Sequence, residues 1–208
     1  MIETLWQQTG YLAGGFAGNL MISGLAMALG TVVGAGLGRI RAIESGPRAA
    51  TALAWLATNL SRNVPSFVLL FYMAFMLPTE VEIGGTSHFV PLWIKATLAL
   101  TFPVIGFASD QSLAYFEQSE MGIRGAGETF AVAWMQYFLI ILMASATASV
   151  IGADEIVGRA NTLVARSGDP SFLLVTYAYV SLWFMAAGLV LSGLLRLLVW
   201  TRSQKVMA

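Results

Sequence analysis

Five long stretches of apolar residues run through this sequence, and they constrain the fold more than any other feature. A helix that crosses a bilayer needs about 20 mostly apolar residues, because each residue adds only about 1.5 Å of rise. Charged residues make up 11% of the chain, whereas soluble domains contain about 25%. We therefore predict an all-α membrane protein with a single transmembrane domain over residues 1–208. The predicted helices span about Phe16–Gly38, Ala50–Leu77, Pro91–Ala108, Phe130–Ile151 and Phe172–Val199.

The basic residues predict how the chain is oriented in the membrane. An odd number of crossings puts the termini on opposite faces, and loops rich in Lys and Arg stay in the cytoplasm. We therefore expect the N-terminus outside and the C-terminus in the cytoplasm. The expected cytoplasmic side carries Arg39, Arg41, Arg48, Arg124, Arg196, Arg202 and Lys205, and the other side carries Lys95, Arg159 and Arg166.

What the sequence lacks argues against several kinds of function. It has no cysteine and a single histidine, His88, so neither a thiolate nor a His-rich metal site is expected. The net charge is zero, which suggests no nucleic-acid partner. No G-x-x-x-x-G-K-[ST] loop is present to hold the phosphates of ATP. The N-terminus has no basic segment before its apolar part, so we expect no cleaved signal peptide.

Three glycines in the first predicted helix are spaced by four residues, at Gly30, Gly34 and Gly38. Residues at this spacing share one face of a helix and let a second backbone approach closely, which is how helices pack in lipid. The pattern predicts close packing, either within the chain or against a partner.

Arg62 lies inside the second apolar stretch, next to Asn63 and close to Pro65. An arginine at mid-depth in lipid costs about 2.5–3.5 kcal/mol on insertion scales, so it should face protein or water. Proline interrupts the hydrogen-bond ladder of a helix. One interpretation is an uncompensated arginine at a helix break beside a polar pathway. The other is an interfacial arginine that extends out of a helix beginning later.

Small and hydroxyl residues fill the end of the fourth apolar stretch, and two acids follow. Ser145, Thr147 and Ser149 cannot all point the same way on a helix, so some could line a solute route while others bond to their own helix. The alternative is a packing interface of small side chains. Adjacent Asp154 and Glu155 splay apart and have no histidine or nucleophile beside them, so we predict no catalytic residues. Asp154 is expected to cap a short outer helix.

The loop between the third and fourth predicted helices is the longest one on the expected cytoplasmic side. It could form a separate surface helix over about Leu113–Met121, ending at Gly122. Such a helix could dock onto a cytoplasmic partner, or the segment could be a solvated connector.

Three stretches together resemble the membrane-spanning permease subunits of bacterial ABC importers, in particular the polar amino acid and opine uptake group. NLMISGLAMALGTVVGAGLGRIRA (19–42) is similar to the first core helix of that family. LATNLSRNVPSFVLLFYMAFMLP (56–78) resembles its R-[GN]-x-P-x-x-[LV] segment, and SATASVIGADEI (145–156) resembles its S-[SL]-x-S-V-I-G-x-x-E-[LI] block. One feature departs from the family: the usual E-A-A-x-x-x-G-x9-I-x-L-P coupling loop is shortened, and no I-x-L-P follows it.

The resemblance implies a type I importer permease in the bacterial inner membrane, taking up amino acids or similar small polar solutes by alternating access. Its implied partners are a second permease subunit, homologous or identical, two cytoplasmic ATP-binding subunits that hold ATP and Mg, an extracytoplasmic solute-binding protein and the lipid bilayer. The chain itself would be a non-catalytic subunit without a cofactor. The implied pathway residues are Arg62, Asn63, Pro65, Ser145, Thr147 and Ser149. The implied coupling loop contains Glu117, Gln118, Ser119, Gly122 and Arg124, and Asp154 and Glu155 would shape an outer gate or contact the binding protein.

Two alternatives belong to other classes of membrane protein. A non-transporting anchor or assembly subunit would explain the glycine faces and the reduced loop without a solute path. Half of an ion-driven secondary carrier would require acids at mid-membrane, whereas the acids of this sequence lie in loops or near predicted helix ends.

Overall fold

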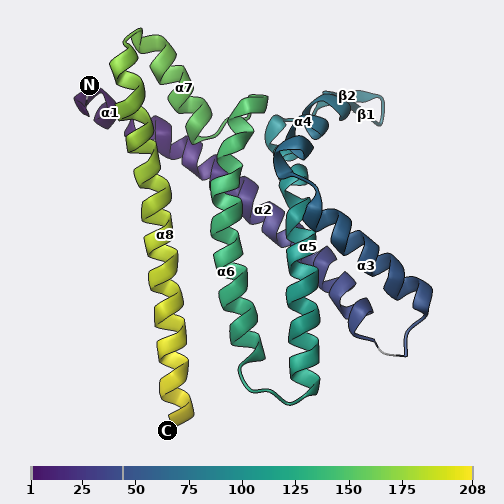
Figure 1. Ribbon diagram of the computed structural model, residues 1–208. Coiled ribbons are helices and arrows are strands. Elements are labelled where there is room, and N and C mark those ends of the chain that lie inside the picture. Colours follow the sequence, from purple (N-terminus) through teal and green to yellow (C-terminus); the bar gives the residue numbers. More distant parts are fainter. Residues whose placement is uncertain (1, 44, 208) are drawn as a thin grey trace.

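The computed structural model describes residues 2–43 and 45–207, with the side chains of 2, 83 and 198–207 outside the description. Helices dominate, and they form an upright array that one oblique helix crosses (Figure 1). The described chain begins and ends at opposite ends of this array. In chain order the elements are α1 (Ile2–Gln7), α2 (Thr9–Ala42), α3 (Arg48–Asn63), α4 (Ser66–Met76), β1 (Glu80–Ile83), β2 (Thr86–Phe89), α5 (Leu92–Glu120), α6 (Ala126–Ser145), the 3-10 helix η1 (Ala146–Ile151), α7 (Ile156–Ser167) and α8 (Pro170–Met207).

Among the described residues, four helical segments are long and apolar enough to cross a membrane. They are Thr9–Ala42, Leu92–Glu120, Ala126–Ile151 and Pro170–Leu197. Each contains one of the predicted helices or closely matches it, although α2, α5 and α8 extend well beyond the predicted bounds. The chain is therefore a multi-pass helical membrane protein. Arg202 and Lys205, which contributed to the predicted orientation, lie among the side chains that are not described.

The second predicted helix, Ala50–Leu77, is wrong as a single element. The chain forms two shorter helices there, α3 with 16 residues and α4 with 11 residues. At about 1.5 Å of rise per residue, neither alone reaches the roughly 30 Å of a bilayer core. Helix α3 is amphipathic, with Leu53 and Trp55 exposed on one side and Thr58 and Ser61 buried on another.

Helix α5 is the central element, and α2 crosses it obliquely (Figure 1). The contact is close because Gly30, Gly34 and Gly38 all face α5: a Cβ atom at Gly34 would lie 2.6 Å from the Ala108 Cβ. The three glycines thus serve packing within the chain. Upstream, Gly18 lies equally close to the backbone of Asp154 ahead of α7.

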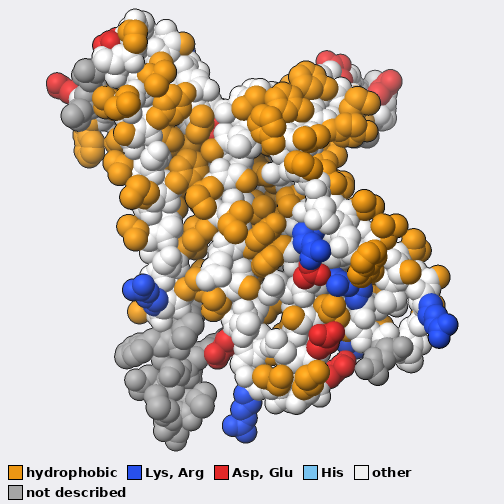
Figure 2. Space-filling view, in the orientation of Figure 1, with side chains coloured by type: hydrophobic (Ala, Val, Ile, Leu, Met, Phe, Trp, Pro, Cys, Tyr) orange, Lys and Arg blue, Asp and Glu red, His pale blue; other side chains and the backbone are white. Residues whose placement is uncertain are grey.

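Two clusters of buried apolar residues hold the helices together. The larger one joins α2, α4, α5 and α6 around residues such as Met27, Leu70 and Leu100. The second joins α1, α2, α6, α7 and the first turns of α8 around Leu12 and Ile156. Beyond those turns α8 carries a largely exposed apolar surface, as expected of a helix that faces lipid. Figure 2 shows apolar side chains over the upper part of one face and Lys and Arg side chains in its lower part.

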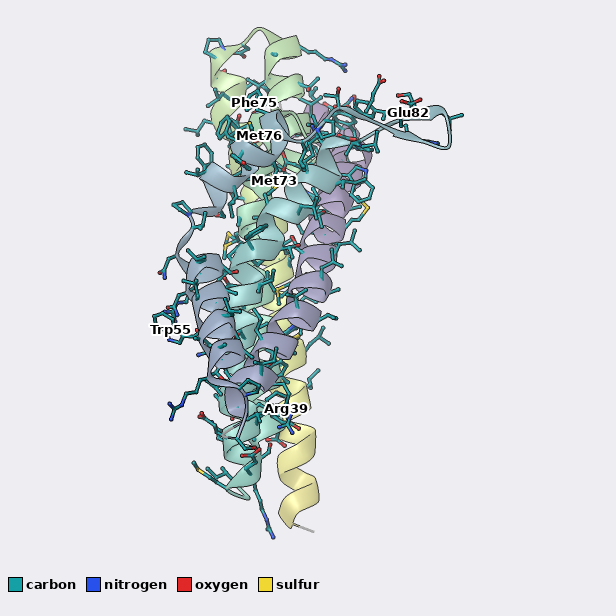
Figure 3. The ribbon with its side chains drawn as sticks, turned by 90° about the vertical axis from the view of Figure 1, so that its right-hand side faces the viewer. Arg39, Trp55, Met73, Phe75, Met76 and Glu82 are labelled. Carbon is teal, nitrogen blue, oxygen red and sulfur yellow. The ribbon has the colours of Figure 1, made fainter. Side chains whose placement is uncertain are left out.

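A short antiparallel hairpin, β1–β2, was not predicted and adds a small sheet to the all-α architecture. Ile83 pairs with Thr86 across a two-residue loop, Gly84–Gly85. Both glycines have positive φ, 62° and 82°, which is the backbone of a tight hairpin turn that residues with a Cβ rarely adopt. In the side view the hairpin with Glu82 projects from one end, whereas Trp55 and Phe75 lie along α3 and α4 on the opposite flank (Figure 3).

Candidate functional site

The break between α3 and α4 brings together three of the predicted site residues. Arg62 and Asn63 end α3, and Pro65 immediately precedes α4. Val64 is extended (φ −79°, ψ 125°), because proline disfavours helical geometry in the residue before it. Both Arg62 and Asn63 are exposed. The break therefore presents polar side chains beside an interrupted backbone, about midway along a segment that is otherwise apolar.

Arg62 is not uncompensated, which corrects the prediction. Its Nη1 donates to Asp110 Oδ2 at 2.9 Å, and its Nη2 donates to Asn59 Oδ1 at 3.1 Å. Asp110 lies within α5, beyond the predicted end of the third helix. The sequence placed this acid near a predicted helix end, but α5 continues past it to Glu120, so it lies inside one of the four helices long and apolar enough to cross a membrane.

A second arginine binds the same carboxylate. Arg41 at the end of α2 donates through Nη1 to Asp110 Oδ1 at 2.8 Å and to Ser109 Oγ at 2.9 Å. The hydroxyls of Ser109 and Thr58 lie 2.7 Å apart. This charge cluster, formed by Arg41, Arg62, Asp110, Ser109 and Thr58, joins α2, α3 and α5 at one point.

A glycine on α5 makes the cluster geometrically feasible. A Cβ atom at Gly106 would lie 2.8 Å from the backbone nitrogen and 2.8 Å from the Cβ of Arg62. Since Gly106 and Asp110 are four residues apart, they lie on the same face of α5. The sequence analysis named neither Gly106 nor Asp110 as a site residue. A glycine followed four residues later by a carboxylate is nevertheless a pattern that could have indicated a second helix packed closely against this face and bonded to the carboxylate.

The hydroxyl tract begins at the last residue of α6, Ser145, and continues through the 3-10 helix η1, which contains Thr147 and Ser149. Each of these hydroxyls bonds to its own backbone. Ser145, Thr147 and Ser149 donate to the carbonyl three residues earlier, at 2.7, 2.6 and 3.0 Å. Ser145 is buried, Ser149 is half-buried and Thr147 is exposed. The tract packs on α4 and α7, whereas the partners of Arg62 come from α3 and α5, so the structure does not unite the two predicted groups in one bonded network.

Glu155 rather than Asp154 caps the short outer helix, so the predicted cap is wrong by one residue. The Glu155 carboxylate accepts from the amides of Val157 at 2.9 Å and Gly158 at 2.6 Å, the second and third amides of α7. Asn19 of α2 donates to Glu155 Oε2 at 3.1 Å and to Ser145 Oγ at 2.9 Å. Burial raises the pKa of the Glu155 carboxyl, although the two amides and Asn19 act in the opposite direction. With 0% of its surface exposed, Glu155 has no contact surface for another protein in this conformation.

Asp154 is exposed and forms an ion pair with Arg159. Arg159 donates to both carboxylate oxygens at 2.7 Å, and this hydrogen bonding lowers the pKa of Asp154. Of the two acids at the predicted outer gate, Asp154 is the one whose side chain faces outward.

The predicted coupling residues lie at the turn between α5 and α6. The separate helix expected over Leu113–Met121 is wrong, because α5 continues without interruption to Glu120. It ends where predicted, since Gly122 has φ 70° and donates to Ser119 O. Arg39 on α2 lies 3.7 Å from Glu120 and stacks over Phe116, which ties this end of α5 to α2. The predicted residues Glu117, Ser119, Gly122 and Arg124 are exposed, and Gln118 is half-buried.

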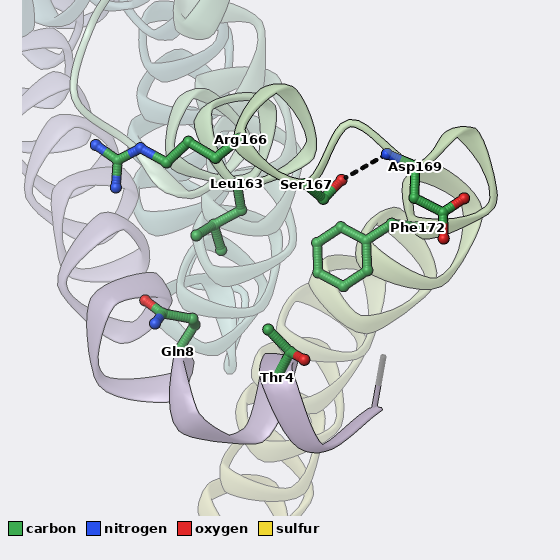
Figure 4. Close-up of a pocket in the computed structure, with 7 residues that line it drawn as sticks. All are labelled: Thr4, Gln8, Leu163, Arg166, Ser167, Asp169 and Phe172. Carbon is green, nitrogen blue, oxygen red and sulfur yellow. Dashed lines mark hydrogen bonds between the residues drawn. The ribbon is translucent and has the colours of Figure 1, made fainter.

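A pocket of about 400 Å³ lies elsewhere, between α1, α7 and the start of α8 (Figure 4). It contains none of the predicted site residues. Among the described residues, no group of three or more His, Asp or Glu side chains is placed so that it could hold a metal ion. The pocket is lined by Thr4, Gln8, Leu163, Arg166, Ser167, Asp169 and Phe172.

No family model matches the sequence, and no curated protein matches it. Two solved structures share its fold. A chain of a structure described as an amino acid ABC transporter with histidines aligns with TM-score 0.74 and 16% identity, covering 95% of this chain and 97% of that one. A chain of the MetNI methionine ABC transporter in inward-facing conformations aligns with TM-score 0.63 and 16% identity, covering 91% and 97%. The chain therefore has the fold of a membrane component of ABC transporters.

Proposed function

We propose that this chain is the permease subunit of an ATP-driven importer for amino acids or similar small polar solutes. The observation that carries the proposal is the extent of the structural likeness, which covers 95% of this chain and 97% of the amino acid transporter chain. Such coverage extends beyond the four long helices to most of the chain that connects them. The absence of a nucleotide-binding loop from the sequence fits a subunit whose ATP and Mg are held by separate partners.

The flank formed by α3 and α4 supports a second permease subunit as a partner. Arg62 and Asn63 are exposed near the middle of this flank and Asn59 is half-buried beside them. Interrupted backbone is tolerated at membrane depth only against protein or water. Large aromatic side chains surround these polar residues, with Trp55 on one side and Phe75 on the other. Interface cores are enriched in aromatic residues. The solute would pass between the two permeases along this flank, next to Arg62.

The chain would transport its solute by alternating access. It would lie in the bacterial inner membrane with its N-terminus outside and its C-terminus in the cytoplasm. The turn between α5 and α6, from Glu117 to Arg124, would contact the ATP-binding subunit. A contact shifts a conformational equilibrium only if it differs between the two states. Because α5 continues without interruption from Asp110 to Glu120, a push on the turn would be transmitted along the helix to Asp110. Asp154 would face the extracytoplasmic binding protein.

Reconstitution tests the proposal. The chain would be purified with a second permease and an ATP-binding subunit encoded beside it, placed in liposomes, and assayed for ATP-dependent uptake of an amino acid panel in the presence of the binding protein. Arg62→Ala should reduce uptake while leaving the amount of membrane-inserted chain unchanged. A cysteine at Glu117 should crosslink to the ATP-binding subunit. A stable complex that hydrolyses ATP without uptake of any solute would instead favour an anchoring role.

A further inference from the structure

The charge cluster at the α3–α4 break carries one more positive than negative charge. Arg41 and Arg62 both bind Asp110, one to each carboxylate oxygen. A single carboxylate balances one guanidinium group, and the second positive charge is left facing the exposed flank. An unbalanced charge beside an apolar surface is unfavourable unless water or an anion lies next to it.

The two arginines differ in how firmly they are held. The Arg41 side chain is 13% exposed, and its Nη1 bonds to Ser109 as well as to Asp110. The Arg62 side chain is 53% exposed. Moving Arg41 away would break two hydrogen bonds at a largely enclosed position, which is costly. Moving Arg62 away leaves Asp110 still paired with Arg41, so Arg62 is the partner that can leave.

We propose that Arg62 exchanges its bond to Asp110 for a bond to a carboxylate group of the transported solute. The inference rests on the proposed function and assigns the charge of the solute group that binds at this point. A planar guanidinium binds a carboxylate through two parallel hydrogen bonds. The exchange replaces one carboxylate by another, so Arg62 remains paired before and after it. Asp110 is then a positioning residue that holds Arg62 at the break when no solute is bound.

The first test measures the local charge without requiring transport. The chain contains no cysteine, so Asn63→Cys places a single exposed thiol beside Arg62. The full chain in lipid nanodiscs is labelled with an anionic and a cationic methanethiosulfonate reagent of similar size, and the ratio of the two rates is compared between variants. Adding Arg62→Gln should lower the anionic-to-cationic ratio on the order of tenfold, the effect expected for one partly screened charge at close range.

Two matched variants control the labelling experiment. Arg62→Lys keeps the charge and should keep the ratio. Arg48→Gln removes an exposed charge from the first turn of the same helix, at the opposite end, and should also keep it. A ratio that is the same with and without the Arg62→Gln substitution would overturn the proposal, provided both chains elute as a single folded species.

The second test measures the exchange in the reconstituted transporter. Uptake of a transported carboxylate solute is compared with uptake of its carboxamide. Arg62→Gln should raise the KM for the carboxylate about tenfold and leave the KM for the carboxamide unchanged, since only the first loses an ion pair. Unchanged KM values for both solutes would overturn the exchange even where uptake itself is robust. Absence of all uptake, together with an Arg62-dependent labelling ratio, would instead reject the proposed function and the exchange while retaining an anion-attracting site.

Discussion

Replacing Gly34 by alanine should loosen the contact between α2 and α5, whereas the same replacement at Gly36 should not. A Cβ atom at Gly34 would lie 2.6 Å from the Ala108 Cβ, 2.6 Å from the Ile105 carbonyl oxygen and 2.9 Å from the Ser109 nitrogen. Two of these three atoms belong to the α5 backbone, so no side-chain rotation relieves the clash. Gly36 is on the same helix and has no atom within 4 Å of such a Cβ.

The size of the effect follows from these distances. Ordinary contacts of a Cβ begin at 3.4 Å, so the two helices would have to separate locally by about 0.8 Å. Overpacking of this kind costs about 1–3 kcal/mol. Alanine also gains up to about 1 kcal/mol over glycine in a helix, but both variants share this gain. The free energy of unfolding should therefore differ between the two variants by about 1–3 kcal/mol.

Thermal unfolding of the purified chain in detergent measures this difference, with all variants heated at one scan rate because membrane proteins often unfold irreversibly. A loss of 1 kcal/mol shifts the midpoint by about 2–4 °C in a chain of this size. The midpoint of Gly34→Ala should lie about 2–12 °C below that of Gly36→Ala. Equal midpoints would refute the conclusion that backbone contact at Gly34 holds α2 against α5.

Three further predictions concern polar side chains. Asn19→Ala should destabilise the chain by about 1–3 kcal/mol, because the buried carboxylate of Glu155 loses a donor; an unchanged unfolding midpoint would contradict this. Lys95→Met should cost a similar amount in the same assay, because two carbonyl oxygens at the end of α4 lose the buried ammonium group that now bonds to them at 3.1 and 2.9 Å. Asp154→Asn should cost less than about 1 kcal/mol, because the Asp154 side chain is 72% exposed and its ion pair with Arg159 is screened by solvent on that side. The folded-state pKa of Asp154 is lowered, so its ion pair stabilises the folded chain fully above the unfolded-state pKa, and this stabilisation is lost as pH falls through the folded-state pKa. The mutant and the parent chain should therefore have the same unfolding midpoint in strong acid.

The four long helices could be predicted because hydrophobic length alone identifies them. The second predicted helix failed because α3 and α4 are together as long as a spanning helix, and hydropathy averages over the break between them. Pro65 and Arg62 marked the position of the break, but the local geometry of Val64 and Pro65 decides between a kink and two separate helices. The hairpin was recognisable in principle, since Gly84–Gly85 between residues rich in Val, Ile and Thr is typical of a tight turn.

The charge cluster could not be assembled from the sequence. Asp110 lies in the polar stretch SDQS, which lowers the hydropathy at the predicted end of the third helix, between Ala108 and the helix expected from Leu113. In the structure these polar residues belong to the middle of α5, where Ser109 and Asp110 bond to Arg41 and Arg62. Their helical state depends on partners that are distant in the chain. A prediction based on hydropathy therefore ended the third helix at Ala108, immediately before the two α5 residues of the charge cluster.

The small-residue tract shows how a packing requirement can resemble a solute pathway. The Asn19 amide reaches both Ser145 and Glu155, which requires α2 to approach the end of α6 closely. Bulky residues at this point would hold the helices apart, so small residues accompany the buried carboxylate. The Ser145 hydroxyl accepts from Asn19 and donates to the Leu142 carbonyl, which commits its proton within the chain. Thr147 also bonds to its own helix but is exposed, so it is the hydroxyl of this tract best placed to meet a solute without disrupting the core. Thr147→Val should accordingly alter the KM for uptake more than the unfolding midpoint, and Ser145→Val should do the reverse.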